Sequence, residues 1–155
     1  MSRSDMSILL ATDGSELAAH AIERGLAVLS PAGRHLLVTV VPAADPLLVV
    51  GSGHAGPTMT PDEQLELMDV REREAADILD GAATAISSVT TGVDVERLVL
   101  HGDAGRAICD CAAEHGVDVI VIGTRGQGGL RRAVLGSVSD HVVRHAPCPV
   151  LTVGG

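Results

Sequence analysis

The chain has 155 residues, 46% of them hydrophobic, and it contains no Phe, Tyr or Trp. This length corresponds to one domain, whose core must consist of aliphatic side chains. With 11 basic and 20 acidic residues, the formal net charge is -9. Because binding to a phosphate backbone needs clustered cations, this balance disfavours nucleic-acid partners.

Membrane and secretory segments are not expected. No apolar run reaches the roughly 18–20 residues that a membrane helix needs, and no long apolar segment follows the first charged residues. The three cysteines, Cys109, Cys111 and Cys148, have neither metal-site nor CxxC spacing. Without a secretory signal, an odd number of cysteines indicates reduced thiols in the cytoplasm. Cys109 and Cys111 are two apart on a predicted helix, so we expect them on different faces.

The first third of the chain predicts two strands with a helix between them. An apolar run at residues 7–11 predicts the first strand. Asp13 follows it at capping-box spacing from Glu16, which predicts the start of a helix that extends to about residue 29. Residues 35–41 are apolar almost throughout, which is typical of a parallel strand covered on both faces.

Residues 43–60 are predicted to form a loop, since glycines and a proline are concentrated within them. Two interpretations stay open for this loop: a plain flexible connection, or a lid over a ligand site. Thr60 then predicts the N-cap of the longest helix, which has proline and acidic residues in its first turn and extends to about residue 89. One apolar face of this helix comprises Leu65, Met68, Ala75, Leu79, Ala82, Ile86 and Val89. We expect Met68 to belong to the core.

The rest of the chain continues the alternation. The predicted strands are 93–100, 117–122 and 150–153, and the predicted helices are 104–115 and 137–146. The first of these strands alternates only partly in polarity, which favours the edge of a sheet. Gly116 is a helix C-cap in this interpretation. Strands that alternate with helices throughout predict a parallel α/β sheet with right-handed crossovers.

A glycine-rich segment joins the fourth strand to the last helix, from Gly123 to Ser137. Such a segment suits a phosphate group, because backbone N–H groups approach closely and the helix N-terminus favours an anion. Its close-approach positions are Gly126, Gly128 and Gly129, and Gly136 lets the chain enter the helix. The hydroxyl of Ser137 serves either as an ordinary N-cap or as a phosphate contact, and the two roles are compatible.

Three arginines, Arg125, Arg131 and Arg132, make this segment a local positive spot in an acidic chain. They are either solvated or directed at phosphate. The segment lacks a P-loop lysine and does not fit GxGxxG, which disfavours P-loop NTPases and dinucleotide dehydrogenases. His141 and His145 have metal-compatible spacing without a third ligand, so solvated histidines are the preferred interpretation. Phosphoryl transfer needs positioned charge, and the sequence therefore indicates binding with at most slow hydrolysis.

The spacing of this segment resembles that of a known family. Gly123, two residues, Gly126, nine residues and Gly136-Ser137 are similar to the nucleotide-binding loop of the universal stress protein family. Asp13 after the first strand, His101-Gly102-Asp103 after the third, and the tail Ala-Pro-Cys-Pro-Val-Leu at 146–151 agree with that resemblance. It covers nearly the whole chain, and residues 43–60 are its least characteristic part.

The resemblance implies a fold. We expect residues 1–155 to form a single α/β domain with an open five-stranded parallel sheet of order 3-2-1-4-5 and helices on both faces. This is the Rossmann-like fold of the adenine-nucleotide hydrolase type. In such sheets, ligands bind beyond the carboxyl ends of the strands where the strand order reverses. The sequence alone leaves the strand order open.

The resemblance also implies a function: a cytoplasmic, ATP-binding regulatory protein of the stress response. Asp13 would contact the ribose or hold Mg²⁺, although its pattern alone indicates a helix cap. The implied nucleotide-binding residues are Ala11, Thr12, Asp13, Val40, Val41, Gly102, Gly123, Arg125, Gly126, Gly128, Gly129, Gly136, Ser137 and Val138. The resemblance also implies a homodimer through residues 150–153, and an apolar edge strand is a suitable pairing surface. An unidentified protein partner is expected as well.

Two alternatives remain open at this point. The first is a metal-dependent nucleotide hydrolase that uses Asp13. The second is a dimeric interaction module that binds no nucleotide, as other branches of the family do. AMP, ADP and cyclic AMP would suit the same site chemistry as ATP.

Overall fold

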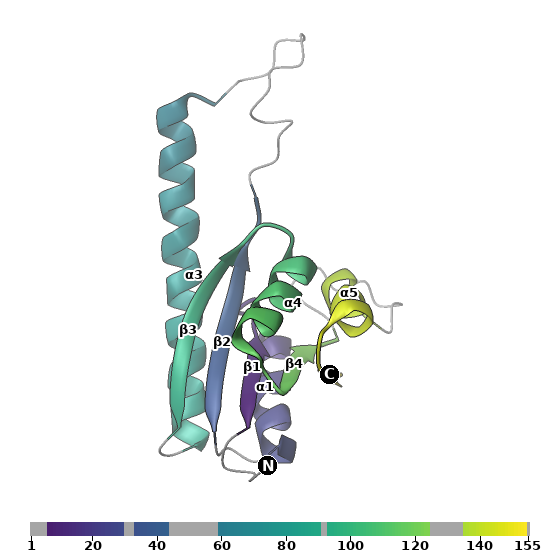
Figure 1. Ribbon diagram of the computed structural model, residues 1–155. Coiled ribbons are helices and arrows are strands. Elements are labelled where there is room, and N and C mark those ends of the chain that lie inside the picture. Colours follow the sequence, from purple (N-terminus) through teal and green to yellow (C-terminus); the bar gives the residue numbers. More distant parts are fainter. Residues whose placement is uncertain (1–5, 30–32, 44–58, 91–92, 125–134, 155) are drawn as a thin grey trace.

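The computed structural model describes residues 6–29, 33–43, 59–90, 93–124 and 135–154. Strands and helices alternate along this part of the chain (Figure 1). The strands are β1 (Ser7–Ala11), β2 (Arg34–Val41), β3 (Asp94–His101), β4 (Val119–Gly123) and β5 (Val150–Val153). The helices are α1 (Glu16–Leu29), α3 (Pro61–Val89), α4 (Ala104–His115) and α5 (Ser137–His145). None of these helices combines the length and the apolar character that crossing a membrane requires.

The described strands form one parallel sheet of order β3-β2-β1-β4-β5, which confirms the order that the family resemblance implies. β1 lies in the middle, where Leu10 pairs with Leu37 of β2 on one side and with Val121 of β4 on the other. β3 occupies an edge, as its partial alternation predicted. The order of the strands therefore reverses between β1 and β4.

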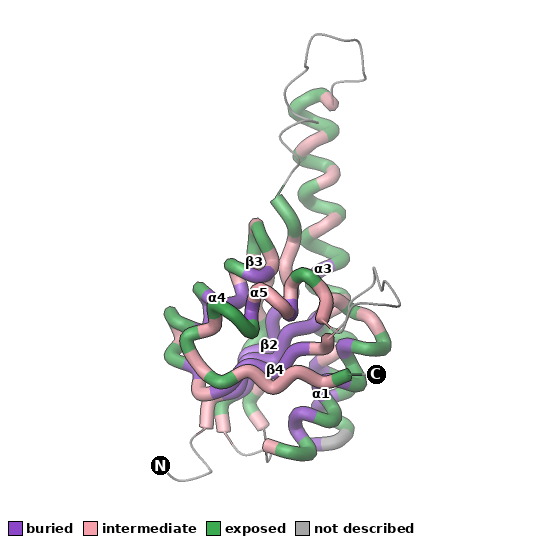
Figure 2. Tube along the Cα trace, turned by 90° about the vertical axis from the view of Figure 1, so that its right-hand side faces the viewer, coloured by how far each residue is buried: buried purple, intermediate pink, exposed green. Residues whose placement is uncertain are grey.

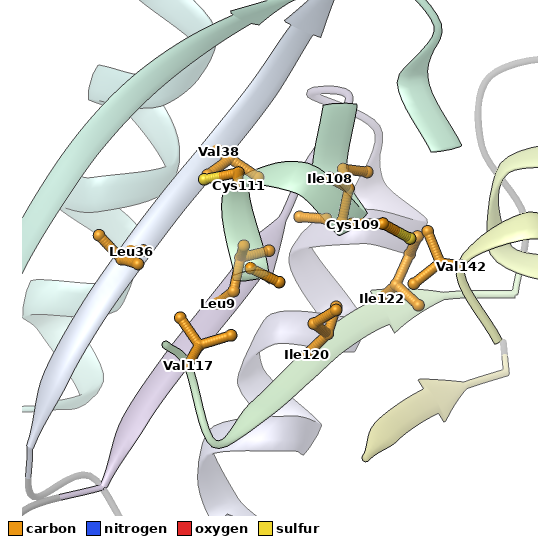
Figure 3. Close-up of a cluster of buried hydrophobic side chains, with 12 residues drawn as sticks. Leu9, Leu36, Val38, Ile108, Cys109, Cys111, Val117, Ile120, Ile122 and Val142 are labelled. Atoms are coloured by element: carbon orange, nitrogen blue, oxygen red, sulfur yellow. The ribbon is translucent and has the colours of Figure 1, made fainter. Parts of the chain in front are cut away.

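Helices cover both faces of the sheet (Figure 2). α1 and α3 pack on one face, against alternate residues of the central strands such as Ile8 and Leu10. α4 and α5 pack on the other face, against Leu9 and Leu36 (Figure 3). Adjacent residues of one strand thus enter two different cores, which is why the central strands are apolar almost throughout.

Cys109 and Cys111 point in different directions, as their spacing predicted. Figure 3 shows Cys111 beside Val38 of β2, and Cys109 close to Val142 of α5. Both are buried, because α4 packs against the sheet and against α5. Burial raises the pKa of both thiols and that of Cys148, and all three cysteines are free. Thiols of raised pKa are poor nucleophiles at neutral pH.

The start of α1 differs from the predicted capping box. The helix begins at Glu16, and the hydroxyl of Ser15 accepts the N–H of Ala18 at 3.1 Å. The carboxylate of Asp13 accepts instead from the backbone N–H of Ser15 at 3.0 Å and from its hydroxyl at 2.6 Å. The prediction of an Asp13–Glu16 box is therefore wrong. Asp13 forms a local turn with Ser15, and this moves the cap two residues along the chain.

The start of α3 is as predicted, whereas its apolar face is not. Thr60 and Glu63 form a capping box: the Thr60 hydroxyl accepts the Glu63 N–H at 3.3 Å, and the Glu63 carboxylate accepts the Thr60 N–H at 2.7 Å. The placement of Met68 in the core is wrong, because the first half of α3 projects beyond the ends of the strands (Figure 1). The lid interpretation of residues 43–60 falls mostly on 44–58, outside the described residues.

Candidate functional site

The reversal of strand order places the candidate site at the carboxyl ends of β1 and β4. These two strands are hydrogen-bonded neighbours, and the helices that follow them lie on opposite faces of the sheet. α1 leaves β1 toward the face that α3 covers, and α5 leaves β4 toward the face that α4 covers. The loops after the two strands therefore diverge. We call this position the switch point, and it is where open α/β sheets bind ligands.

The chain after β1 is held at the switch point by short-range hydrogen bonds. The N–H of Thr12 donates to the carbonyl of Val38 at 2.9 Å and continues the ladder with β2 beyond Ala11. Gly14 then turns the chain with φ of 79°, and its N–H donates to the Thr12 hydroxyl at 3.1 Å. Asp13, between them, is half-buried. The turn thus fixes the Asp13 carboxylate just beyond the carboxyl end of β1.

Gly14 also brings the turn against α3. A Cβ on this glycine would lie 2.9 Å from Cγ1 of Ile78, so both the positive φ and the close packing require glycine here. The position of the Asp13 turn therefore depends on α3 as well as on β1.

β2 and β3 extend past the end of β1 on one side of the switch point. Ala11 pairs with Val38, so Val40 and Val41 lie beyond the last residue of β1. Val41 pairs with His101, and the N–H of Gly102 donates to the Val41 carbonyl at 3.0 Å. Both valines are half-buried, and Val40 packs against the core on the face that α4 and α5 cover.

The glycine-rich segment begins and ends on the other side of the switch point. Residues 125–134 lie outside the described residues, and so do the predicted contacts of Arg125, Gly126, Gly128 and Gly129. The two ends of the segment are joined, because the N–H of Gly136 donates to the carbonyl of Thr124 at 2.6 Å.

Ser139 reinforces this junction. Its hydroxyl lies 3.2 Å from the Thr124 carbonyl and 3.0 Å from that of Gly136, and the residue is buried. The end of β4 at Gly123 and Thr124 therefore lies directly beside Gly136 at the start of α5. The sequence analysis did not identify Thr124 or Ser139, although a serine three residues after a helix N-cap is a frequent backbone-bonding position.

α5 begins without a side-chain cap. Gly136 is its N-cap, in an extended conformation, and Ser137 is its exposed first residue. The interpretation of Ser137 as the N-cap is therefore wrong by one position. Val138 is half-buried and packs on the core beneath α4 and α5. The first N–H groups of any helix lack intrahelical partners, and such a start suits an anion.

The described site residues thus fall into three groups around the switch point. Ala11, Thr12 and Asp13 follow β1. On the β2–β3 side lie Val40, Val41 and Gly102. On the β4 side lie Gly123, Gly136, Ser137 and Val138.

Metal-binding groups are sparse in the described part of the chain. No cluster of three or more His, Cys, Asp or Glu side chains is arranged there to hold a metal ion. The rings of His141 and His145 stack on each other, with centroids 4.3 Å apart. Asp13 supplies one carboxylate at the switch point. In proteins, Mg²⁺ is commonly held by one or two carboxylates together with phosphate oxygens and waters.

Comparison with known sequences identifies the family. The model of the universal stress protein family matches residues 6–154. The universal stress protein YxiE of Bacillus subtilis is 30% identical over 147 residues, which cover 94% of this chain and 97% of that protein. A universal stress protein of Thermus aquaticus is 37% identical over 148 residues, which cover 95% of this chain and 97% of that protein.

Solved structures show the same fold. The universal stress protein UspA of Lactobacillus plantarum superposes with a TM-score of 0.74 at 24% identity, covering 99% of each chain. A universal stress protein in complex with cAMP has a TM-score of 0.56 at 23% identity, covering 97% of each chain. An Arabidopsis thaliana member with AMP bound has a TM-score of 0.63 at 20% identity, covering 96% of this chain and 91% of that one. This chain belongs to the universal stress protein family.

Proposed function

We propose that this protein binds an adenine nucleotide at the switch point, namely ATP with Mg²⁺, and acts as a nucleotide-dependent regulatory protein of the stress response. The observation that carries the proposal is the hydrogen bond from Gly136 to Thr124, which joins both ends of the glycine-rich segment at the carboxyl end of β4, the neighbour of β1. The cAMP and AMP complexes of two relatives support an adenine nucleotide as the ligand. Three free thiols suit the cytoplasm.

Each part of the nucleotide has a partner in this proposal. The phosphates lie against the first turn of α5 at Ser137 and Val138 and against the glycine-rich segment, where Arg125 adds positive charge. Asp13 accepts hydrogen bonds from the ribose or binds Mg²⁺, which would neutralise phosphate charge. The sequence has no aromatic side chain to stack on the base. The adenine therefore lies between aliphatic groups and meets the backbone of residues 11–12 and 40–41.

The chemistry of the chain favours binding over turnover. Phosphoryl transfer ordinarily uses a lysine and metal ions to stabilise charge on the transferred group. The whole sequence contains no lysine, and Asp13 is the carboxylate that the described residues bring to the switch point. ATP therefore acts as a ligand that shifts the protein between states, with at most slow hydrolysis. Such a shift requires different affinities for the two states.

The proposal includes a homodimer through β5. This strand is the last in the described sheet; the carbonyl of Pro149 accepts from Ile120 of β4, and that of Val153 accepts from Thr124 directly after β4. In a parallel ladder, alternate residues bond to the same neighbour, so the backbone groups of Val150 and Thr152 point away from β4. A second copy of β5 would pair with this edge.

Calorimetric titration with ATP, with and without Mg²⁺, tests the nucleotide site. Asp13→Asn keeps the local turn and removes the charge, and we expect it to weaken Mg²⁺-ATP binding by about tenfold or more, in line with a lost charge-assisted contact. Asp94→Asn makes the same change at the opposite end of the sheet and should leave binding unchanged. If the wild-type protein binds neither ATP, AMP nor cAMP, the proposal is wrong and the interaction module replaces it. Rapid Mg²⁺-dependent phosphate release that Asp13→Asn abolishes would favour the hydrolase.

A further inference from the structure

The apolar face of α3 continues past the end of the sheet. In the second half of the helix, Leu79 and Ile86 pack in the core that α1 and α3 share. Toward the N-terminus the same face carries Ala75, then the charged Glu72, and then Met68 and Leu65. Ala75 is 4% exposed, whereas Met68 is 52% and Leu65 62% exposed. The helix therefore presents a core-type face where it projects beyond the strands (Figure 1). We call Leu65 and Met68 the α3 stripe.

The rim of the α3 stripe is acidic on one side, whereas Arg71, one turn after Met68, lies on the other side. Residues 61–70 hold four acidic residues and no basic one: Asp62, Glu63, Glu66 and Asp69. Acidic residues in the first turn stabilise the helix through its dipole, and this explains the first two. Glu66 and Asp69 lie beyond the first turn, are exposed, and flank the stripe on one side. The dipole does not account for them.

Three contacts order α3: one at its start, one along its projecting half, and one where it packs against the turn after β1. The capping box of Thr60 and Glu63 satisfies its first N–H groups. The Glu72 carboxylate is hydrogen-bonded to the ring of His101 at the carboxyl end of β3. Further along the helix, Ile78 packs against Gly14. The stripe is therefore presented by a preorganised helix, which reduces the ordering cost of binding a partner.

We propose that the α3 stripe is the docking surface for a basic amphipathic helix of a partner protein. The apolar side of such a helix would cover Leu65 and Met68, and its lysines or arginines would lie against Glu66 and Asp69. In this mode of recognition, an amphipathic helix makes its contacts through apolar side chains that are three or four residues apart. Charge complementarity selects the occupant: a second copy of the chain would bring the same carboxylates to the rim, and like charges oppose that pairing.

A defined peptide tests the proposal without nucleotide, so the result is independent of ATP binding. The probe is a fluorescent peptide of leucine and lysine that is amphipathic as a helix, and its control has the same composition in scrambled order. We expect Leu65→Ser/Met68→Ser to lower affinity for the amphipathic peptide by about tenfold or more, because the buried apolar area is lost. The control Leu17→Ser/Val28→Ser removes exposed apolar side chains from α1 and should leave affinity unchanged. Equal losses in both variants, or equal binding of the scrambled peptide, would overturn the proposal.

The acidic side of the rim is tested with two double variants that change the net charge equally. Glu66→Gln/Asp69→Asn should weaken peptide binding and flatten its dependence on salt, because two ionic contacts are removed. Asp110→Asn/Glu114→Gln makes the same charge change on the exposed side of α4 and should have no such effect. If the two pairs behave alike, the peptide responds to bulk charge and the proposal fails.

Two further outcomes would assign the stripe to a different occupant. A self-association that Leu65→Ser/Met68→Ser abolishes would assign it to a second copy of the chain. A thiol introduced by Met68→Cys that reacts with maleimide only after unfolding would show that this chain covers the stripe itself. Each outcome contradicts the proposal. We expect instead rapid labelling in the native protein and protection by the amphipathic peptide, against the low background of the native thiols.

Discussion

The N–H of Gly136 donates to the carbonyl of Thr124 at 2.6 Å and joins the two ends of the glycine-rich segment. Ser139, buried one turn into α5, places its hydroxyl within hydrogen-bond distance of both residues' carbonyls. The start of α5 is thereby fixed to the end of β4. Because fixed ends reduce the conformational freedom that a loop loses when it binds an anion, we assign Ser139 a positioning role.

Replacing Ser139 and Ser137 separates positioning from contact. Ser139→Ala removes the hydroxyl from two carbonyls that keep their backbone N–H donors, and it should lower the free energy of unfolding by about 0.5–1.5 kcal/mol and also weaken ATP binding. Ser137→Ala, at an exposed position, should weaken ATP binding with little change in stability. Urea unfolding and calorimetric titration measure the two quantities. The positioning role is wrong if Ser139→Ala lowers stability and leaves ATP affinity at the wild-type value.

Two glycines in the middle of helices should respond in opposite directions to alanine. A Cβ on Gly25 of α1 would lie 2.5 Å from Cγ1 of the buried Val121, whereas one on Gly81 of α3 meets nothing within 4 Å. Gly25→Ala should destabilise the protein by about 1–3 kcal/mol through overpacking. Gly81→Ala should stabilise it by about 0.5–1 kcal/mol, because alanine favours the helix. Unfolding in urea measures both, and a shift of the same sign for both variants would contradict the close packing of α1 on β4.

His35 makes stability depend on pH. It is fully buried in β2, and neither ring nitrogen has a hydrogen-bond partner among the residues that the structure describes. Burial lowers its pKa below the ordinary value of 6.5, so the unfolded chain takes up a proton at higher pH than the folded protein does. Above about pH 6.5, the ordinary pKa of histidine, His35 therefore does not make the free energy of unfolding depend on pH. The free energy of unfolding falls as pH drops below that value toward the folded pKa, by at most about 1.4 kcal/mol per pH unit.

The variant His35→Leu tests this dependence. It removes two unpartnered polar atoms from the core and should raise stability at neutral pH. It should also flatten the loss of stability between about pH 6.5 and 5 relative to the wild-type protein. His145→Gln, at an exposed position on α5, serves as the control and should retain the wild-type slope. Parallel pH profiles for wild type and His35→Leu would show that His35 is not the titrating group.

The proposed dimer is tested at Thr152. Because the backbone of this residue points away from β4, Thr152→Pro should block pairing with a second copy and spare the ladder with β4. Thr152→Val keeps the N–H and should remain dimeric. Analytical ultracentrifugation gives the mass, and circular dichroism confirms that each variant is folded. A Thr152→Pro protein that remains dimeric would place the dimer interface elsewhere.

Periodicity and spacing anticipated the architecture, and the family resemblance supplied the strand order. The apolar runs found all the described strands, and the Thr60–Glu63 cap was visible because capping is local. Met68 was misplaced because a helical period reports which side chains share a face and not whether anything lies opposite. Thr124 was missed because its contacts join residues that are far apart along the chain, whereas Ser139 was missed although its bond to Gly136 is local. The capping box of Asp13 with Glu16 was wrongly predicted because an aspartate side chain can also bond to the backbone two residues further on, as Asp13 does with Ser15.

The most direct measurement identifies the small molecule that co-purifies with the protein. The protein would be purified without added nucleotide and denatured, and the released molecules separated by ion exchange. Since the chain has no Phe, Tyr or Trp, near-ultraviolet absorbance of the native protein itself reports a bound base. Our account predicts an adenine nucleotide, principally ATP, in a stoichiometric amount. Absence of any nucleotide, followed by no binding of added ATP with Mg²⁺, would contradict the account.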